Sequence, residues 1–168
     1  VYGQNEYISQ TIFAENQNYW GGKTDSEIVK TNFKFGYVDP EITYRSLGIQ
    51  FAYTGIDMGS SFGNRSHDIN QSSIFTNIIY NSIIGNTYNK IKTGISISYD
   101  EYDEYISNLD SSGYDISRVE KSVGAYFEYN YNDSDKVNLS AGIRLDNHNK
   151  IGTFISPRFH INYMLFPK

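Results

Sequence analysis

The stretch Val137-Asn138-Leu139-Ser140-Ala141-Gly142-Ile143-Arg144-Leu145-Asp146 alternates between apolar and polar or small residues. Its odd positions are apolar throughout, and a period of two predicts a β-strand with one apolar and one polar face. The stretch also has about the 9–11 residues that a tilted strand needs to cross a bilayer, whereas strands of soluble proteins average about 5–6. It therefore predicts a strand with lipid on one face and a water-filled lumen on the other.

The same alternation recurs along the chain. It is clear in residues 47–53, 91–99 and 123–131, and shorter in residues 32–37 and 158–165. Residues 74–84 are apolar on both parities, so this segment predicts a strand but does not decide which of its two faces is turned to lipid. The opening stretch, about residues 5–15, has the weakest pattern. Together with the first stretch, these segments predict eight strands.

The connections between these segments alternate in length. Tight turns are predicted at Asp39-Pro40-Glu41, at residues 85–89 and at residues 132–135, because Pro, Gly, Asn and Asp gather there. Long polar connections are predicted at residues 16–30, 55–72, 100–119 and 146–156. This sorting is typical of up-and-down membrane barrels, with short periplasmic turns and long external loops. The predicted fold class is all-β, an antiparallel up-and-down transmembrane β-barrel.

Composition excludes several function classes. The net charge is −5 and no basic cluster exists to follow a phosphate backbone, so nucleic acid is not expected as a partner. The absence of Cys excludes disulfides and thiolate zinc sites. The three histidines are dispersed, and no motif places a Ser beside a His and an acid. We therefore expect no enzyme and no cofactor.

The polar parity indicates how large the barrel is. It is rich in serine and in glycine, and a closed eight-stranded barrel must instead fill its axis with bulky side chains. A wider lumen that holds a separate domain tolerates such small residues. The glycines concerned are Gly36, Gly48, Gly94, Gly124 and Gly142.

The two ends of the sequence favour the same interpretation. The chain begins at Val1 rather than Met, and Pro167-Lys168 follow Phe166 where a finished barrel normally ends on an aromatic residue. We expect a portion of a larger barrel. The alternatives are a complete eight-stranded barrel for adhesion or membrane stability, and a soluble glycan-binding β-sandwich.

Several segments carry a family resemblance. Residues 124–129, residues 139–146, Gly152 and Ser156-Pro157-Arg158 together resemble the mid-barrel region of TonB-dependent outer-membrane receptors. Residues 82–87 and 90–94 are similar to the version found in Bacteroidota. The resemblance covers roughly residues 30–166.

The resemblance implies a barrel of about 22 strands closed by a plug domain. Residues 1–168 would be about eight strands of it, without the plug. It also implies energised uptake of an iron chelate (siderophore), cobalamin or glycan across a Gram-negative outer membrane. The implied partners are outer-membrane lipid, the receptor's own plug, the TonB complex and the small imported ligand.

Five residues on the polar parity are candidates for a patch on the lumen wall: Glu128, Arg144, Asp146, Arg158 and His160. Arg144 and Arg158 would lie opposite each other if their connection centres near Ile151. Such a patch attracts an anionic ligand or contacts the plug. Alternatively, it is a cross-strand network that satisfies polar groups in the lumen.

Two further groups lie in predicted external loops. Asp100, Glu101, Asp103 and Glu104 form an acidic cluster that either binds Ca²⁺ or is a solvated loop, and no other metal site is expected. Tyr19 and Trp20 either stack on a sugar or chelate, or anchor the chain at the membrane interface.

Overall fold

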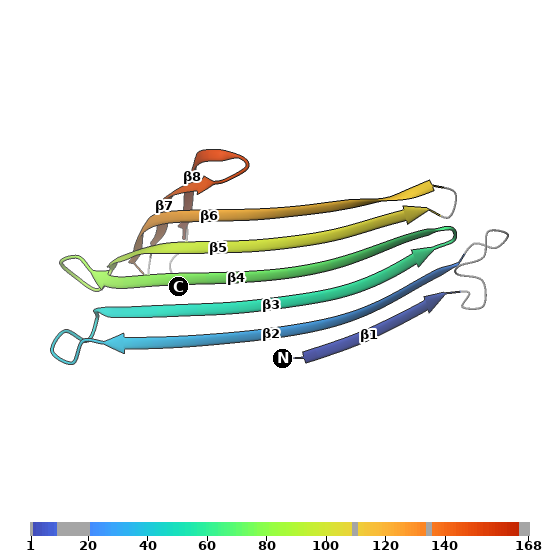
Figure 1. The fold of residues 1–168 in the computed structure, drawn as a ribbon. Coiled ribbons are helices and arrows are strands. Elements are labelled where there is room, and N and C mark those ends of the chain that lie inside the picture. Colours follow the sequence, from blue (N-terminus) through green and yellow to red (C-terminus); the bar gives the residue numbers. More distant parts are fainter. Residues whose placement is uncertain (1, 10–20, 109–110, 134–135, 165–168) are drawn as a thin grey trace. The chain divides into compact units, whose positions relative to one another are not determined.

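The computed structural model of the chain describes residues 2–9, 21–108, 111–133 and 136–164. They form eight strands in a sheet whose spatial order follows the sequence, as Figure 1 shows. The strands are β1 (Tyr2–Ser9), β2 (Gly22–Val38), β3 (Ser46–Phe62), β4 (Arg65–Ile83), β5 (Asn89–Asn108), β6 (Ser111–Asp133), β7 (Val137–His148) and β8 (Gly152–Tyr163). Within the described residues, no pairing joins β1 to β8, so this sheet is not closed. These residues contain no helix long and apolar enough to span a membrane.

The strands are longer than the alternating segments predicted. β2 to β6 contain between 17 and 23 residues each, well above the roughly 9–11 that cross a bilayer. The prediction of long loops at residues 55–72, 100–119 and 146–156 is therefore wrong, because strand covers most of each stretch. In the stretch predicted at 16–30, β2 begins at Gly22.

The physical reason is that these outer strand segments are mostly polar, and that residues 55–62 carry their apolar side chains on the even parity. They do not continue the odd-parity alternation of the inner segments, yet their backbones still pair with a neighbouring strand. β3 and β4 join through Gly63 and Asn64 alone, and Gly63 has a φ of 62°. A Gly-Asn pair is a known signal for a two-residue hairpin, so the sequence did contain this turn.

The tight turns predicted at Asp39-Pro40-Glu41 and at residues 85–89 are confirmed, while residues 134 and 135 of the turn predicted at 132–135 lie outside the described residues. The Asp39 carboxylate accepts hydrogen bonds from the backbone N–H groups of Glu41 (3.0 Å) and Ile42 (3.1 Å), which is how Asp initiates a turn. Gly85 has a φ of 74°, and the Asn86 side chain accepts from the backbone N–H of Tyr88. Local side-chain chemistry therefore sets these turns.

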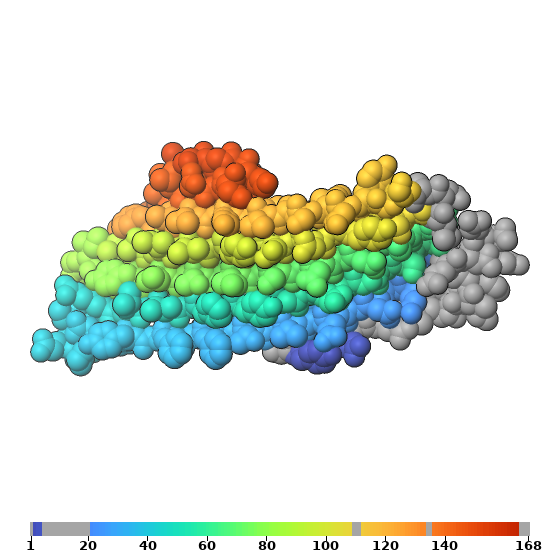
Figure 2. Space-filling model, viewed as in Figure 1, coloured from blue at the N-terminus to red at the C-terminus, as the bar shows by residue number. Residues whose placement is uncertain are grey.

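The described residues fall into two compact units. The first contains β1 with residues 21–32, 52–74 and 99–120, and β1 pairs there with residues 22–29 of β2. The second contains residues 33–51, 75–98 and 121–164, including all of β7 and β8. Figure 2 shows neighbouring strands of each unit as adjacent bands of side chains.

The second unit exposes its apolar parity. Phe35 and Phe159 are 70% and 68% exposed, and among the described residues no large side chain is fully buried. On this face Phe33 of β2 lies near Phe51 of β3, with ring centroids 6.5 Å apart. The exposed set includes Phe33, Tyr37, Leu47, Ile49, Phe51, Ile95, Ile97, Val123, Phe127, Ile143, Leu145, Ile155 and Ile161. The described strands of this unit thus lack the apolar core of a soluble sandwich, and their exposed apolar face is of the kind that lipid covers in membrane barrels.

The structure also fixes the facing of the segment at 74–84. Asn77 accepts a hydrogen bond from the Tyr126 hydroxyl, and Asn81 donates to the Ser46 hydroxyl at 3.2 Å. Ile74 and Ile78, on the opposite parity of β4, are exposed. The odd positions of this segment therefore lie on the polar face of the sheet.

Candidate functional site

The polar face of β6, β7 and β8 carries the predicted patch. All five candidates occupy even positions, and the antiparallel register aligns these positions in rows across the three strands. The rows are Gly124–Asp146–Phe154, Tyr126–Arg144–Ser156, Glu128–Gly142–Arg158 and Asn130–Ser140–His160. Arg144 therefore lies opposite Ser156, and the prediction that it faces Arg158 is wrong. The hairpin turns one residue earlier than predicted, which moves each partner by two positions and keeps every side chain on its predicted face.

Arg144 and Asp146 form the less exposed of the two ion pairs on this face. The guanidinium Nε donates to Oδ2 at 2.7 Å and Nη2 donates to Oδ1 at 2.6 Å, which is a bidentate geometry. Nη2 also donates to the Ser96 hydroxyl at 2.6 Å, so the pair reaches from β7 to β5. Asp146 is only 5% exposed, so the Arg144 guanidinium is the partner that compensates a carboxylate removed from water.

Tyr126 extends the network to β4. Its hydroxyl donates to Asn77 Oδ1 at 3.4 Å, and the Arg144 guanidinium lies 5.9 Å from its ring centroid. Between β4 and β6, the side chain passes over Gly94 of β5. A Cβ atom at Gly94 would collide with the Tyr126 hydroxyl and with the Ile78 backbone carbonyl.

Part of the glycine content of the polar face is thus explained by neighbouring side chains. Tyr126 occupies the space above Gly94, while the Arg144 and Asp146 side chains occupy the space above Gly124. At Gly36, by contrast, a Cβ atom would meet nothing within 4 Å. Glycine there leaves open space, which is what the sequence predicted for the whole face.

Glu128 and Arg158 form a second ion pair across Gly142. Arg158 Nη2 donates to Glu128 Oε2, and the Asn130 amide donates to the other carboxylate oxygen at 2.8 Å. The Arg158 side chain is 69% exposed, so solvent screens this pair. His160 lies on the same face, one row from Arg158, and contributes to neither ion pair.

These side chains line a groove of about 610 Å³ on the polar face of the second unit. We call it the polar groove; its polar lining residues are Gln50, Asn77, Lys92, Tyr126, Glu128, Arg144, Ser156 and Arg158. Three of them are cations, and Glu128 is the one acid. Arg144 and Arg158 have carboxylate partners, whereas no acid of the described residues pairs with Lys92. The polar groove thus offers a lysine charge to an anionic group.

Several of these residues were absent from the sequence prediction. Ser96 and Tyr126 lie on the polar parity, and their alternation contained the information needed to include them. Asn77 could not be placed, because its segment is apolar on both parities. Lys92 shares the parity of Ser96, but only the packing shows that it is the cation without a carboxylate partner.

The acidic cluster of β5 is engaged with basic side chains. His67 Nε2 lies 3.3 Å from Glu104 Oε2, and Arg118 donates to the other carboxylate oxygen. The Arg118 guanidinium also lies 4.3 Å from the Tyr102 ring centroid and 3.3 Å from Glu120. The described residues hold no group of three or more His, Cys, Asp or Glu side chains that could bind a metal ion. The calcium hypothesis for Asp100, Glu101, Asp103 and Glu104 gains no support from this arrangement, and Tyr19 and Trp20 lie outside the described residues.

Glu104 makes the outer part of the sheet sensitive to acid. Burial raises the pKa of its carboxyl, but hydrogen bonds and charges from Arg118 and His67 outweigh burial and hold the pKa below its ordinary 4.5. A lowered folded-state pKa contributes stability above the ordinary pKa, and this contribution is lost as pH falls through the lowered value.

We therefore expect Glu104→Gln to show a smaller loss of stability on acidification than the wild type. The free energy of unfolding, measured by guanidinium denaturation at neutral pH and again below the lowered pKa, gives this loss for each protein. Glu101→Gln is the matched control, because the described partner of Glu101 is the Tyr99 hydroxyl at 3.3 Å. This variant should lose as much stability as the wild type when the pH is lowered. Identical acid sensitivity in Glu104→Gln and wild type would contradict the assignment.

Comparison with known proteins identifies the family. The family model described as TonB dependent receptor-like, beta-barrel, matches residues 2–168. The chain belongs to this family of TonB-dependent receptors. The resemblance seen in the sequence is therefore confirmed, and the family consists of receptors and transporters rather than enzymes.

A solved structure gives the same fold. The crystal structure of the ferric citrate transporter FecA in its unliganded form matches with a TM-score of 0.57 and 14% identity. The match covers 98% of this chain and 30% of that one, so the chain spans under a third of the transporter's length. Eight up-and-down antiparallel strands thus match part of a TonB-dependent barrel, which confirms the predicted fold class. No curated protein matches the sequence significantly.

Proposed function

We propose that these strands form part of the outer-membrane barrel wall of a receptor that imports a scarce ligand with energy from TonB. The ligand classes are those named from the sequence: an iron chelate, cobalamin or a glycan. The observation that carries the proposal is that the second unit has one apolar and one polar face. The family model of the barrel supports it, because it matches residues 2–168. Its apolar parity is exposed as lipid contact requires, while its polar parity carries ion pairs and the polar groove.

The exposed apolar face favours a membrane wall over a soluble sandwich. A sandwich buries one face of each sheet against the other, which yields fully buried large side chains. The described residues contain none, and their large aromatic and aliphatic side chains are widely exposed. Transport is tested by deleting the gene and measuring uptake of labelled ferric chelates, cobalamin and oligosaccharides. Loss of TonB-dependent uptake of one class is expected; unchanged uptake of all three would contradict the proposal.

Within this receptor, we propose that the polar groove receives an acidic group of the plug or of the passing ligand. Lys92 supports this role, because it lines the groove without a carboxylate partner among the described residues. A lysine in such a site contributes most when an anion completes it, since a charge-assisted hydrogen bond is about twice as strong as a neutral one.

Lys92→Gln is expected to lower the initial rate of uptake by about tenfold, the effect of losing one charge-assisted hydrogen bond of roughly 1.5 kcal/mol. Lys34→Gln is the matched control: Lys34 lies on the polar parity of β2 and does not line the groove. Equal rates for the two variants, with equal amounts of receptor in the membrane, would contradict a role for the groove.

A further inference from the structure

We propose that a second site, at the tip of the β3–β4 hairpin, binds a hydroxyl-bearing ring such as one sugar residue; this inference rests on the proposed receptor function. The site is a pocket of about 330 Å³ in the first unit. We call it the tip pocket, and its lining residues are Ser61, Gly63, Asn64, Arg65, Ser66, Ser107 and Asn108. Its volume is near the lower end of the roughly 300–1,000 Å³ of small-molecule sites, which suits a single ring.

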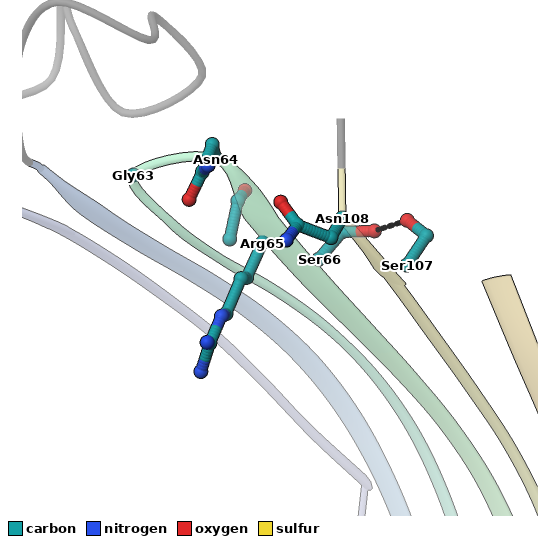
Figure 3. A pocket seen from close by; sticks show the side chains of 7 residues that line it. Gly63, Asn64, Arg65, Ser66, Ser107 and Asn108 are labelled. Atoms are coloured by element: carbon teal, nitrogen blue, oxygen red, sulfur yellow. Dashed lines mark hydrogen bonds between the residues drawn. The ribbon is translucent and has the colours of Figure 1, made fainter. Parts of the chain in front are cut away.

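The pocket is built by two strand ends. The Gly63–Asn64 turn reverses the chain with a positive φ at Gly63, and the Gly63 N–H donates to the Gly21 carbonyl at 2.8 Å. The end of β5 supplies Ser107 and Asn108. Ser66 and Ser107 join the two elements through a 2.6 Å hydrogen bond between their hydroxyls, drawn as the dashed line in Figure 3.

Among the residues that the structure describes, one polar atom of this pocket has no hydrogen-bond partner. The Asn108 carboxamide oxygen is shielded from solvent and accepts no hydrogen bond. A buried acceptor left without a donor costs about 1–3 kcal/mol, so such an atom calls for an explanation. Figure 3 shows the Asn108 side chain directed toward the Asn64 side of the pocket, where a ligand donor would reach it.

The other lining groups select the ligand class. None of the described residues that line the pocket is acidic, which disfavours a cation. In Figure 3 the Arg65 guanidinium extends away from Asn108, so it does not make the space around the orphan oxygen an anion site. In the Ser66–Ser107 pair one hydroxyl proton is used and the other remains free to donate. Amides and hydroxyls that donate and accept within one small space match the vicinal hydroxyls of a sugar.

The test uses the whole receptor in lipid nanodiscs, with methyl glycosides of glucose, galactose, mannose and N-acetylglucosamine as probes. Saturation-transfer difference NMR detects their binding. We expect at least one glycoside to receive saturation from the wild type. Asn108→Leu should weaken its binding about fivefold, the effect of one neutral hydrogen bond, whereas Asn108→Asp keeps the acceptor and should keep the signal.

Asn147→Leu is the matched control, because Asn147 is an exposed hairpin amide that donates to Thr153 at 2.7 Å, outside the tip pocket. Ser107→Ala provides a second variant should Asn108→Leu fail to insert, and it should also weaken binding about fivefold. The proposal is overturned if no glycoside binds the folded wild type, or if Asn108→Leu and Ser107→Ala bind like Asn147→Leu. TonB-dependent uptake is measured separately: if the wild type imports none of the three ligand classes but still binds a glycoside, the receptor function is contradicted and the tip pocket stands.

Discussion

Gly94→Ala is expected to destabilise the folded barrel by about 3 kcal/mol, the upper end of the range for overpacking a well-packed site. The added Cβ atom would collide with the Tyr126 ring and with the Ile78 carbonyl oxygen. A side chain can swing aside, but the Ile78 carbonyl belongs to the backbone of the neighbouring strand and cannot move alone. The loss is measured as a lower guanidinium midpoint and a reduced heat-modifiable band in the whole receptor.

Gly36→Ala is the control for this substitution. Gly36 is also a strand glycine on the polar parity, and its Cβ would meet nothing within 4 Å. Its effect should stay within about 0.5 kcal/mol, as for surface substitutions in general. Adding Tyr126→Phe to Gly94→Ala should not restore stability, because the backbone collision remains. Equal effects of Gly94→Ala and Gly36→Ala would contradict the packing described here.

Arg144→Met is expected to lower stability by about 3 kcal/mol. The substitution leaves the carboxylate of Asp146, a residue 5% exposed, without its bidentate partner. Breaking a buried ion pair by removing one partner costs roughly 3–5 kcal/mol. The Arg144 side chain is 38% exposed, so solvent screens part of the interaction and the lower end of this range applies. Denaturant unfolding of the receptor in lipid vesicles measures the change.

Two further variants make this prediction specific. Arg158→Met also removes an ion-paired arginine, but its side chain is 69% exposed, and its loss should be about 1 kcal/mol or less. The double variant Arg144→Met with Asp146→Asn removes the unpaired buried charge and should regain most of the stability lost in Arg144→Met. Similar losses for Arg144→Met and Arg158→Met would show that the Arg144–Asp146 pair is not buried as described.

Much of the fold was predictable because lipid and water impose opposite demands on alternate residues. Residues 137–146 and 123–131 showed this alternation directly, and parity alone placed Arg144, Asp146, Glu128 and Arg158 on one face. A register error of two positions leaves each side chain on the same face of its strand and changes only its cross-strand partner. For that reason the face of Arg158 was predicted correctly while its partner was not.

The outer strand segments could not be predicted by continuing the odd-parity alternation, because they are mostly polar. Residues 65–72 pair as a strand although Ile69 is the one apolar residue among them, and in residues 55–62 the apolar side chains Ile56, Met58 and Phe62 stand on the even parity. The role of Gly94 could not be predicted either. In the sequence, a glycine whose missing side chain leaves room for Tyr126 looks the same as a glycine beside an open lumen. Only the packing distinguishes Gly94 from Gly36.

The proposed membrane wall requires that odd positions of β7 face lipid and even positions face the lumen. Residues 1–168 contain no Cys, so a single cysteine at Asn138, Leu139, Ser140, Ala141 or Ile143 can carry a nitroxide label without background from these residues. Electron paramagnetic resonance of the receptor in lipid then compares collision with oxygen, which concentrates in the bilayer, and with a water-soluble nickel chelate. We predict that oxygen accessibility is high at the odd positions and low at the even ones. Equal accessibility on both parities, or nickel accessibility at the odd positions, would contradict the membrane wall.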